Sequence, residues 1–377
     1  MKILSDNIIF SPKNVDLNYS PINNIIRNKT YIMGAFNPGM CRLPNGNILL
    51  IVRIAESLKE PIHKNNFSII RKDTNKGYVI DKYPAGNLNT GDPRKYSFAK
   101  YQPIPVYGLT SFSWLLPIEL TPDGQKIIRI HYDKIIEPQE SYQEYGLEDP
   151  RITYIDGKYY MTTCSVSSER HCTTLYSSED GLDYKLVGII LDHQNKDMVL
   201  FPQMIEGKYY ALTRPLGNIY FITPKTSDYN PGPAINLAVS PDLLHWKPVD
   251  EPFIRAKKDS LISMKLGGGA PPIASKKGWL ILFHGVEKKE EVGIYRTYLA
   301  ILDKMNPSIV KYLDENNPVL QSQESLTRNL KKGFYIKNVV FTTGILAHED
   351  NYIIASGELD FCCRITTITQ DSILAEI

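Results

Sequence analysis

The segment Gly146-Leu-Glu-Asp-Pro-Arg151 places two carboxylates, a proline and an arginine in succession at the start of a predicted strand. Proline fixes its own φ and restricts the residue before it, so Asp149 is predicted to be held extended with its carboxyl aimed in one direction. A carboxyl held in this way can act as a general acid. The structural alternative is that Asp149 and Arg151 form an ion pair or a turn cap.

Oxyanion-binding side chains recur further along the chain at corresponding places in a repeat. They are Lys196, Arg214, Lys265, His284 and Tyr295. Arginine offers a planar fork to two oxygens and lysine a compact charge, so a pocket that combines them suits phosphate or a sugar phosphate. Each could instead be a surface charge, a salt bridge or a buried histidine, but their joint placement favours a phosphate site.

The elements that must position these residues are hairpins. A strand, a tight polar turn and a second strand recur at residues 39–53, 151–163, 203–214, 272–284 and 344–355. Asn-Gly and Asp-Gly supply the positive φ values of short hairpins, and the following aromatic and β-branched residues suit a buried sheet. A second hairpin, at residues 120–124, 177–181 and 240–246, follows several copies. Two hairpins make a four-stranded blade, so an all-β, five-bladed β-propeller is predicted, with a β-sandwich as the alternative.

We expect a single domain spanning residues 1–377. Residues 57–108, rich in Lys, Asn, Tyr and Pro, interrupt the repeat and are predicted to form an insertion or lid in the first blade. Inner strands of a propeller converge on its channel, so the residues at the hairpin ends should face one another. The candidates for substrate binding are therefore Asn37, Arg53, Glu148, Arg151, Asp197 and Asp360.

Composition excludes several classes of protein. The chain has 43 Lys plus Arg against 41 Asp plus Glu, so it offers no broad basic surface to nucleic acid or to an anionic membrane. No apolar run approaches the ~18 residues of a membrane span, and the N-terminus lacks the features of a secretion signal, so a cytoplasmic location is expected. The five cysteines and seven histidines lack ligand spacing, so no metal or cofactor is expected.

Several motifs together resemble glycoside hydrolase family 130, the inverting β-mannoside phosphorylases and β-mannosidases. They include Phe-Asn-Pro-Gly at 36–39, Gly-Leu-Glu-Asp-Pro-Arg at 146–151, Asn-Lys-Asp at 195–197, Arg-Pro at 214–215 and the glycine-rich segment 265–273. The resemblance runs from about Phe36 to the C-terminal strands and implies a five-bladed propeller.

The resemblance also implies a reaction. Asp149 would be the general acid, giving its proton through a sugar hydroxyl, while phosphate attacks the opposite face of the anomeric carbon and produces α-mannose 1-phosphate. The positions that match the phosphate site are Lys196, Arg214, Lys265, His284 and Tyr295. The implied activity is phosphorolysis of a short β-linked mannoside, with phosphate as co-substrate and no other cofactor. The linkage, the acceptor sugar and the oligomeric state, a homo-oligomer included, stay open.

Two alternatives to phosphorolysis remain. Some members of the family are hydrolases in which carboxylates replace the cationic residues, and the carboxylates that could serve here are Glu287, Glu290, Glu291 and Glu358. A propeller that binds glycan without turning it over is the other alternative. A general acid also needs a raised pKa at Asp149, which burial or Glu148 would favour and Arg151 would oppose.

Overall fold

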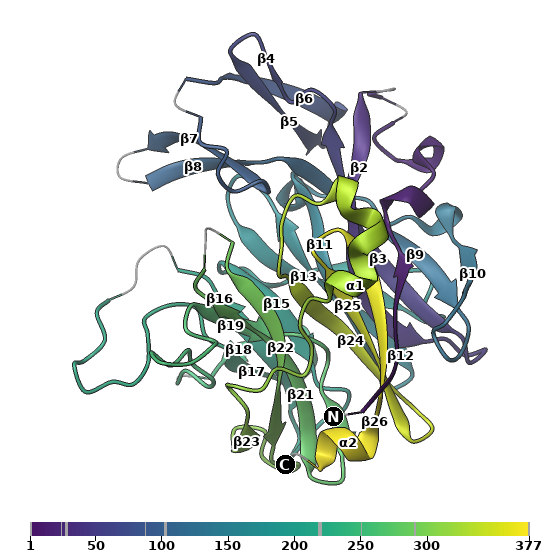
Figure 1. The fold of residues 1–377 in the computed structure, drawn as a ribbon, viewed down its shortest axis with the longest axis vertical. Coiled ribbons are helices and arrows are strands. Elements are labelled where there is room, and N and C mark those ends of the chain that lie inside the picture. Colours follow the sequence, from purple (N-terminus) through teal and green to yellow (C-terminus); the bar gives the residue numbers. More distant parts are fainter. Residues whose placement is uncertain are drawn as a thin grey trace.

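The computed structural model describes residues 2–23, 25–26, 29–86, 88–101, 104–217, 221–249, 251–289 and 292–375. Strands dominate it, and its α-helices are the short α1 (Glu324–Thr327) and α2 (Gln370–Leu374) (Figure 1). Single 3-10 turns lie at Pro12–Asn14, Leu17–Tyr19, Tyr132–Lys134, Ser141–Gln143 and Arg328–Gly333. The all-β prediction is confirmed. Within the described part of the chain no helix has the length and apolar character to cross a membrane.

Most strands form antiparallel groups of four that follow one another along the chain. The first group is β2 (Thr30–Arg42), β3 (Ile48–Leu58), β9 (Ser111–Leu120) and β10 (Ile127–Ile130). The second is β11 (Gly146–Ile155), β12 (Lys158–Val166), β13 (His171–Ser178) and β14 (Lys185–Leu191). A single parallel bridge between Gly146 and Ser113 joins these two groups into one sheet.

Three further groups complete the series. The third is β15 (Asn195–Leu200), β16 (Tyr209–Pro215), β17 (Asn236–Ser240) and β18 (Lys247–Pro248). The fourth is β19 (Lys265–Gly268), β21 (Gly278–Glu287), β22 (Ile294–Leu302) and β23 (Val310–Leu313), with β20 (Ile273–Ser275) also paired to β21. The fifth is β24 (Val340–His348), β25 (Asn351–Glu358), β26 (Cys362–Thr369) and the N-terminal β1 (Ile3–Phe10).

The first strand of each group lies beside other groups. β2 contacts both β11 and β24, β11 contacts β15, and β15 contacts β19. β24 in turn contacts β21 of the fourth group. Each group therefore touches the next, and the fifth touches the first.

In each of the first four groups, the turn between the third and fourth strands contains an aspartate that accepts a hydrogen bond from the local backbone. Asp123, Asp180, Asp242 and Asp303 each accept a hydrogen bond from the backbone N–H two residues further on, at 2.8–3.1 Å. Aspartate favours turns because its side chain can bond its own local backbone in this way. The second hairpin predicted from the sequence is thus present, and the fourth group, where it was not predicted, has it as well.

The N-terminal strand supplies the outer edge of the fifth group through β26. Arg364 of β26 donates to both carboxylate oxygens of Asp6 at 2.7 and 2.6 Å, and Thr366 donates to the same carboxylate at 2.9 Å. The Arg364 side chain has no exposed surface. The first and last strands of the chain are therefore held together by a buried, bidentate ion pair.

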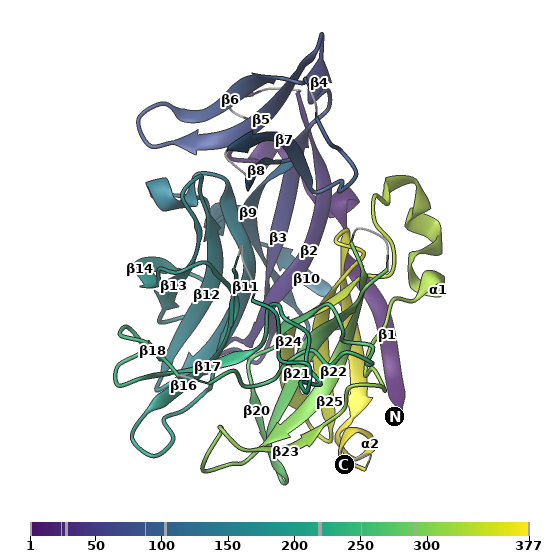
Figure 2. The same ribbon diagram turned by 90° about the vertical axis from the view of Figure 1, so that its left-hand side faces the viewer.

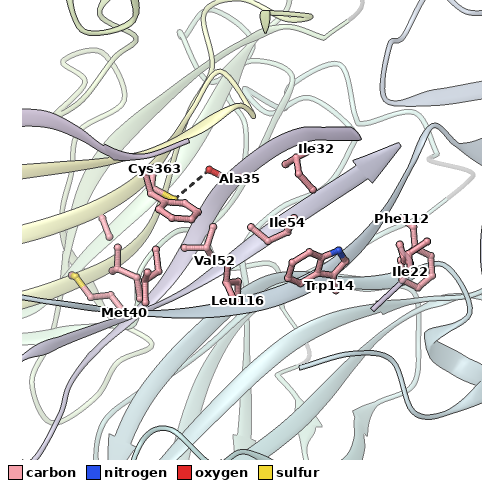
Figure 3. Close-up of a cluster of buried hydrophobic side chains, with 14 of the residues drawn as sticks. Ile22, Ile32, Ala35, Met40, Val52, Ile54, Phe112, Trp114, Leu116 and Cys363 are labelled. Carbon is pink, nitrogen blue, oxygen red and sulfur yellow. Dashed lines mark hydrogen bonds between the residues drawn. The ribbon is translucent and has the colours of Figure 1, made fainter. Parts of the chain in front are cut away.

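The largest core cluster lies between the first and fifth groups. Val52, Ile54, Trp114 and Leu116 pack together there, and Cys363 of β26 joins them from the fifth group (Figure 3). The Trp114 Nε1 donates to the buried carboxylate of Glu56 at 3.0 Å. This core anchors the strands β2, β3 and β9, on which the first part of the site is built.

Two small sheets stand apart from the five groups. β4 (Ile62–His63), β5 (Asn66–Asp73) and β6 (Gly77–Pro84) form one, and β7 (Lys95–Tyr101) and β8 (Ile104–Leu109) form the other. They occupy the upper end of the molecule in Figure 2 and lie between β3 and β9 in the chain. They run from Ile62 to Leu109 and so overlap the segment 57–108, which stays predicted as an insertion.

Candidate functional site

The first strands of the first three groups, β2, β11 and β15, each contain a residue with positive φ at a bulge. Asn37, Asp149 and Asp197 have φ values of 49°, 52° and 55°. At each of them the pairing with the next strand is shifted by a bulge. A bulge re-aims a side chain, and Asn and Asp tolerate left-handed backbone better than most residues. The prediction that Asp149 is extended is wrong, because the bulge shared with the other strands outweighs the local preference set by Pro150.

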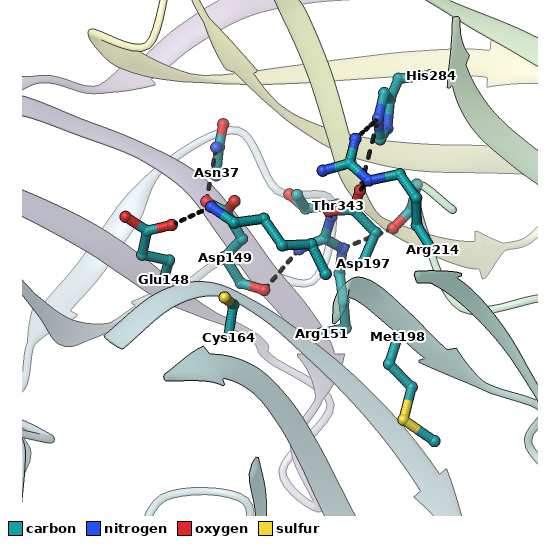
Figure 4. A network of polar contacts seen from close by, with 12 residues as sticks. Asn37, Glu148, Asp149, Arg151, Cys164, Asp197, Met198, Arg214, His284 and Thr343 are labelled. Atoms are coloured by element: carbon teal, nitrogen blue, oxygen red, sulfur yellow. Dashed lines mark hydrogen bonds and ion pairs between the residues drawn. The ribbon is translucent and has the colours of Figure 1, made fainter. Parts of the chain in front are cut away.

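The bulges bring five predicted residues into one hydrogen-bonded group, the acid cluster of Asn37, Arg53, Glu148, Asp149 and Lys196. Asn37 Nδ2 donates to Asp149 at 2.8 Å (Figure 4). Arg53 Nη1 donates to the same Asp149 oxygen at 3.0 Å. Arg53 Nη2 donates to Glu148 at 2.8 Å, and Lys196 Nζ donates to its other oxygen at 2.7 Å. Both carboxylates are therefore fixed by cations from other strands.

These cations set the ionisation of the acid cluster. Burial raises the pKa of Asp149, as does Glu148, but Arg53, Arg151 and Lys196 outweigh them and the net pKa is below its ordinary value. Burial likewise opposes ionisation of Glu148, and Arg53 and Lys196 hold its pKa well below the usual range. The raised pKa that a general acid needs is therefore not what these neighbours give Asp149, whose pKa is lowered. Arg151 is not the main cause, because its Nη1 donates to the backbone oxygen of Asp149 at 2.5 Å.

A second group, the guanidinium cluster, consists of Arg151, Asp197, Arg214 and His284. Asp197 lies 3.4 Å from Arg151 Nη2 and 3.0 Å from Arg214 Nε. Arg214 Nη1 lies 3.1 Å from His284 Nε2 (Figure 4). Burial and the charges of Arg214, Arg151 and Lys265 hold the pKa of His284 well below its ordinary value, so the ring is neutral. Arginine can only donate, so Nε2 accepts and the His284 proton is on Nδ1.

Exposure divides the guanidinium cluster. The side chains of Arg151 and Asp197 are each 1% exposed and that of His284 is 0% exposed, whereas Arg214 is 9% exposed. Arg151 is also tied by its Nε to the backbone oxygen of Gly269 at 2.7 Å. Arg214 is therefore the member with surface left for a ligand, and the other three hold it in place.

Lys265 and Tyr295 form a third group, the lysine–tyrosine pair. Lys265 Nζ lies 5.1 Å from the centroid of the Tyr295 ring. Burial, with the charges of Arg214 and Arg94, lowers the pKa of Lys265. Burial opposes ionisation of Tyr295, but Lys265 and Arg94 outweigh it and lower its pKa. Among the described residues, Lys265 forms no ion pair with a carboxylate.

Asp360 lies on the turn after β25, with φ 46°, and its backbone oxygen accepts a hydrogen bond from Tyr335 at 2.5 Å. Burial raises the pKa of its carboxyl, against the charges of Arg94 and Arg53. The nearest cation is Arg94 Nη1, 4.0 Å from Asp360 Oδ2. Sequence reasoning missed Arg94; the signal that could have found it is a second Asp-Pro-Arg, at residues 92–94.

Two carboxylates kept open as hydrolytic bases are engaged elsewhere. Glu358 is fully buried and accepts from Ser322 at 2.6 Å, the backbone of Gln323 at 3.0 Å and Arg364 at 3.0 Å. Glu287 pairs with Arg296 at 2.9 Å, which lowers its pKa. Glu290 and Glu291 lie outside the described residues.

Positive charge exceeds negative charge across the three clusters and Asp360 taken together. The cations are Arg53, Arg151, Lys196, Arg214 and Lys265, and the carboxylates are Glu148, Asp149, Asp197 and Asp360. The carboxylates other than Asp360 each contact cations within 3.4 Å, so the excess charge is concentrated near Lys265. No group of metal-ligating side chains occurs in the part of the chain that the structure describes.

An all-β frame that holds carboxylates beside a group of cations fits a carbohydrate-active class of protein, in which a carboxyl acts as an acid and cations bind an oxyanion. Residues 111–376 match glycoside hydrolase family 130, described as beta-1,4-mannooligosaccharide phosphorylase, and the chain belongs to this family.

Individual relatives agree with this assignment. The chain is 29% identical to the beta-1,2-mannobiose phosphorylase of Listeria innocua over 87% of each chain. It is 31% identical to the 1,2-beta-oligomannan phosphorylase of a Thermoanaerobacter species over 67% of this chain and 78% of the relative. The solved Listeria innocua beta-1,2-mannobiose phosphorylase in complex with beta-1,2-mannobiose superposes with a TM-score of 0.80 at 25% identity, covering 99% of each chain.

Proposed function

We propose that this protein is an inverting phosphorylase that converts a β-linked manno-oligosaccharide and inorganic phosphate into α-mannose 1-phosphate and a shortened sugar. The observation that carries the proposal is Lys265, a half-buried lysine that has no carboxylate partner among the described residues and whose Nζ lies 5.1 Å from the centroid of the Tyr295 ring. A cation that is partly withdrawn from water without a counter-ion is unfavourable, and a phosphate dianion would supply the counter-ion. The phosphorylase names of its relatives support the same activity.

We assign Asp149 as the general acid. The C1–O bond of the glycoside breaks as a phosphate oxygen bonds to C1 from the opposite face, and the Asp149 proton passes, by way of a sugar hydroxyl, to the leaving oxygen. Asp149 is ionised in the ligand-free protein. A phosphate dianion brought into the site adds negative charge, which raises the pKa of Asp149 toward that of a working acid.

The phosphate-binding set is Lys196, Arg214, Lys265, His284 and Tyr295, and the substrate-binding set is Asn37, Arg53, Glu148, Arg151, Asp197 and Asp360. Burial refines these roles. We propose that His284, Arg151 and Asp197 act through Arg214, since their side chains have almost no exposed surface. Lys196 Nζ forms an ion pair with Glu148 at 2.7 Å, so it would contact phosphate only as a bridge between phosphate and the Glu148 carboxylate.

Hydrolysis would require a carboxylate base in place of phosphate. Glu358 and Glu287, which could have served, are occupied by Arg364 and Arg296. A β-mannosidase is therefore the weaker alternative, and glycan binding without turnover has no observation in its favour.

We further propose that the five strand groups are the blades of a single five-bladed β-propeller. Contacts of each group with the next, and of the fifth with the first, support this arrangement, as do the repeated aspartate turns. The two small sheets of residues 57–108 are then an insertion in the first blade, which we place over the acceptor side of the site.

The activity can be tested with β-1,2- and β-1,4-linked manno-oligosaccharides, each incubated with and without inorganic phosphate. We expect mannose 1-phosphate in the α configuration only when phosphate is present. Free mannose released at a rate independent of phosphate would show a hydrolase instead. Saturable sugar binding with no product under either condition would show a binding protein.

A further inference from the structure

Arg94 lies in the insertion but is directed at the site. Its Nε and Nη2 donate to the two carboxylate oxygens of Asp92 at 2.9 and 3.0 Å. The turn that carries it is fastened to the end of β8, because Thr110 donates its backbone N–H to Arg94 and its hydroxyl to Pro93. Thr110 precedes β9, on which Ser113 accepts a hydrogen bond from Arg53 at 3.0 Å. The position of Arg94 is thus fixed relative to the acid cluster.

The remaining edge of the Arg94 guanidinium is not committed. Its Nη1 is 4.0 Å from Asp360 Oδ2, which is beyond hydrogen-bonding distance, and the side chain is 32% exposed. Its charge acts on Tyr295 and Lys265, lowering the pKa of both. Arg94 therefore approaches the carboxylate expected to hold sugar, and its charge also reaches the lysine–tyrosine pair expected to hold phosphate.

We propose that Arg94 is a further phosphate-binding residue, supplied to the site by the insertion, and that it contacts the phosphate together with Lys265 and Tyr295. The inference rests on the proposed phosphorolysis. Asp92 pre-orients the guanidinium, so little side-chain freedom is lost when its open edge meets an oxyanion. The arginine adds no uncompensated charge to the site, because Asp92 is paired with it.

Phosphate is favoured over sugar by the electrostatics around Arg94. A sugar hydroxyl placed between Arg94 and Asp360 would be neutral and would leave the excess charge near Lys265 unchanged. A dianion placed between Arg94, Lys265 and Tyr295 would be surrounded by donors from two separate parts of the chain. The insertion would thereby take part in binding the second substrate of the reaction as well as in shaping the acceptor side.

The test is Arg94→Gln, with Lys95→Gln as the matched control. Lys95 is the adjacent residue of the same insertion, and its Nζ lies 4.3 Å from the centroid of the Tyr107 ring. Both variants lose one positive charge. We expect the KM for phosphate to rise about 10- to 100-fold in Arg94→Gln, as for a lost hydrogen bond to a charged group, with the KM for the mannoside within about 3-fold of wild type. Lys95→Gln should match wild type, and Arg94→Lys should recover part of the phosphate affinity.

Calorimetric titration with inorganic phosphate alone separates this inference from the proposed activity. If the wild type binds phosphate and Arg94→Gln binds it weakly, the role of Arg94 stands even if no mannoside is turned over. An unchanged phosphate KM and affinity in Arg94→Gln, in an enzyme that makes mannose 1-phosphate, would overturn the role and leave the activity intact. A rise confined to the mannoside KM would overturn it too, and would assign Arg94 to the sugar.

Discussion

Replacing Gly267 by alanine should weaken phosphate binding without altering any charged residue. An added Cβ at this position would lie 2.5 Å from Asp197 Oδ2, 2.6 Å from His284 Cε1 and 2.8 Å from His284 Nε2. All three distances are shorter than side-chain contacts allow. The two residues whose atoms would be displaced are those that hold Arg214.

The expected size of the effect follows from these distances. Carbon atoms pack best at about 3.5–4.0 Å, so the His284 ring and the Asp197 carboxylate would have to move by roughly 1 Å. Such a shift breaks the 3.1 Å contact between His284 and Arg214, and a misplacement of that size can cost about 10²-fold. Overpacking a buried site also costs about 1–3 kcal/mol of unfolding free energy. We therefore expect a 10- to 100-fold higher KM for phosphate in a protein that still folds.

Gly268→Ala is the matched control on the same strand. Its added Cβ would lie 3.1 Å from the backbone oxygen of Asp197 and 3.2 Å from Val199 Cγ2, so it crowds the packing but not the side chains of the guanidinium cluster. Initial rates of mannose 1-phosphate formation at varied phosphate, with urea unfolding in parallel, would separate the two effects. We expect Gly268→Ala to lose some stability and to keep its phosphate KM.

A Gly267→Ala protein with wild-type phosphate KM would refute the reasoning, since Arg214 would then not depend on His284 and Asp197 for its role. Equal losses of phosphate affinity in both glycine variants would also count against it. That result would assign the effect to packing of β19 as a whole.

Other predictions concern single side chains. Asp149→Asn should abolish mannose 1-phosphate formation while leaving the circular dichroism spectrum unchanged, because the amide cannot donate the proton. The free energy of unfolding should be constant near neutral pH and fall below about pH 4.5, because the folded pKa of Glu148 is depressed and the unfolded chain takes up the proton first. Urea unfolding at pH 7 and at pH 4 measures this fall, and Glu148→Gln should make it smaller. Asp6→Ala should lower the unfolding free energy by about 3 kcal/mol, because the buried Arg364 loses its bidentate partner, and urea unfolding would detect it. Glu358→Gln should leave the ratio of mannose 1-phosphate to free mannose unchanged by product analysis, and a fall in free mannose would revive its role as a hydrolytic base.

The repeated hairpins were predictable because their signals are local. Turn residues, alternation and β-branched residues lie within a dozen positions of one another, and β2–β3, β11–β12 and β24–β25 pair where the sequence indicated. The outer hairpin of the fourth group was missed because Asp303 has neither a proline directly before it nor a glycine directly after it, whereas the aspartate of each other copy has at least one of them.

Most residues of the candidate site could be predicted from the sequence, but their arrangement in space could not. Asp149 takes a left-handed φ because it sits at a bulge, which depends on the partner strand and not on its neighbours in sequence. Arg53 is 96 residues away in sequence and Arg151 only two, yet Arg53 is the arginine whose side chain contacts the Asp149 carboxylate. Arg94 was missed since it lies outside the repeat that guided the search; its Asp-Pro-Arg motif is a sequence signal, but its proximity to Asp360 is seen only in three dimensions.

The electrostatics of the site provide a reason for phosphate to be preferred over water as the attacking group. In the ligand-free protein Asp149 is ionised beside Arg53, so it cannot protonate a leaving group in that state. A neutral water molecule near Lys265 would leave both this ionisation and the excess positive charge unchanged. A phosphate dianion would neutralise the excess charge and, as a nearby negative charge, raise the pKa of Asp149. On this mechanism phosphate, the second substrate, raises the pKa of Asp149 so that its carboxyl is protonated and can act as the acid. Hydrolysis is slow because water brings no negative charge and Asp149 stays ionised. Phosphorolysis should therefore require a protonated Asp149, and the reverse reaction, synthesis from mannose 1-phosphate, an ionised one. The kcat of synthesis should then peak at higher pH than that of phosphorolysis. Coincident pH optima would contradict the link between phosphate binding and the ionisation of Asp149.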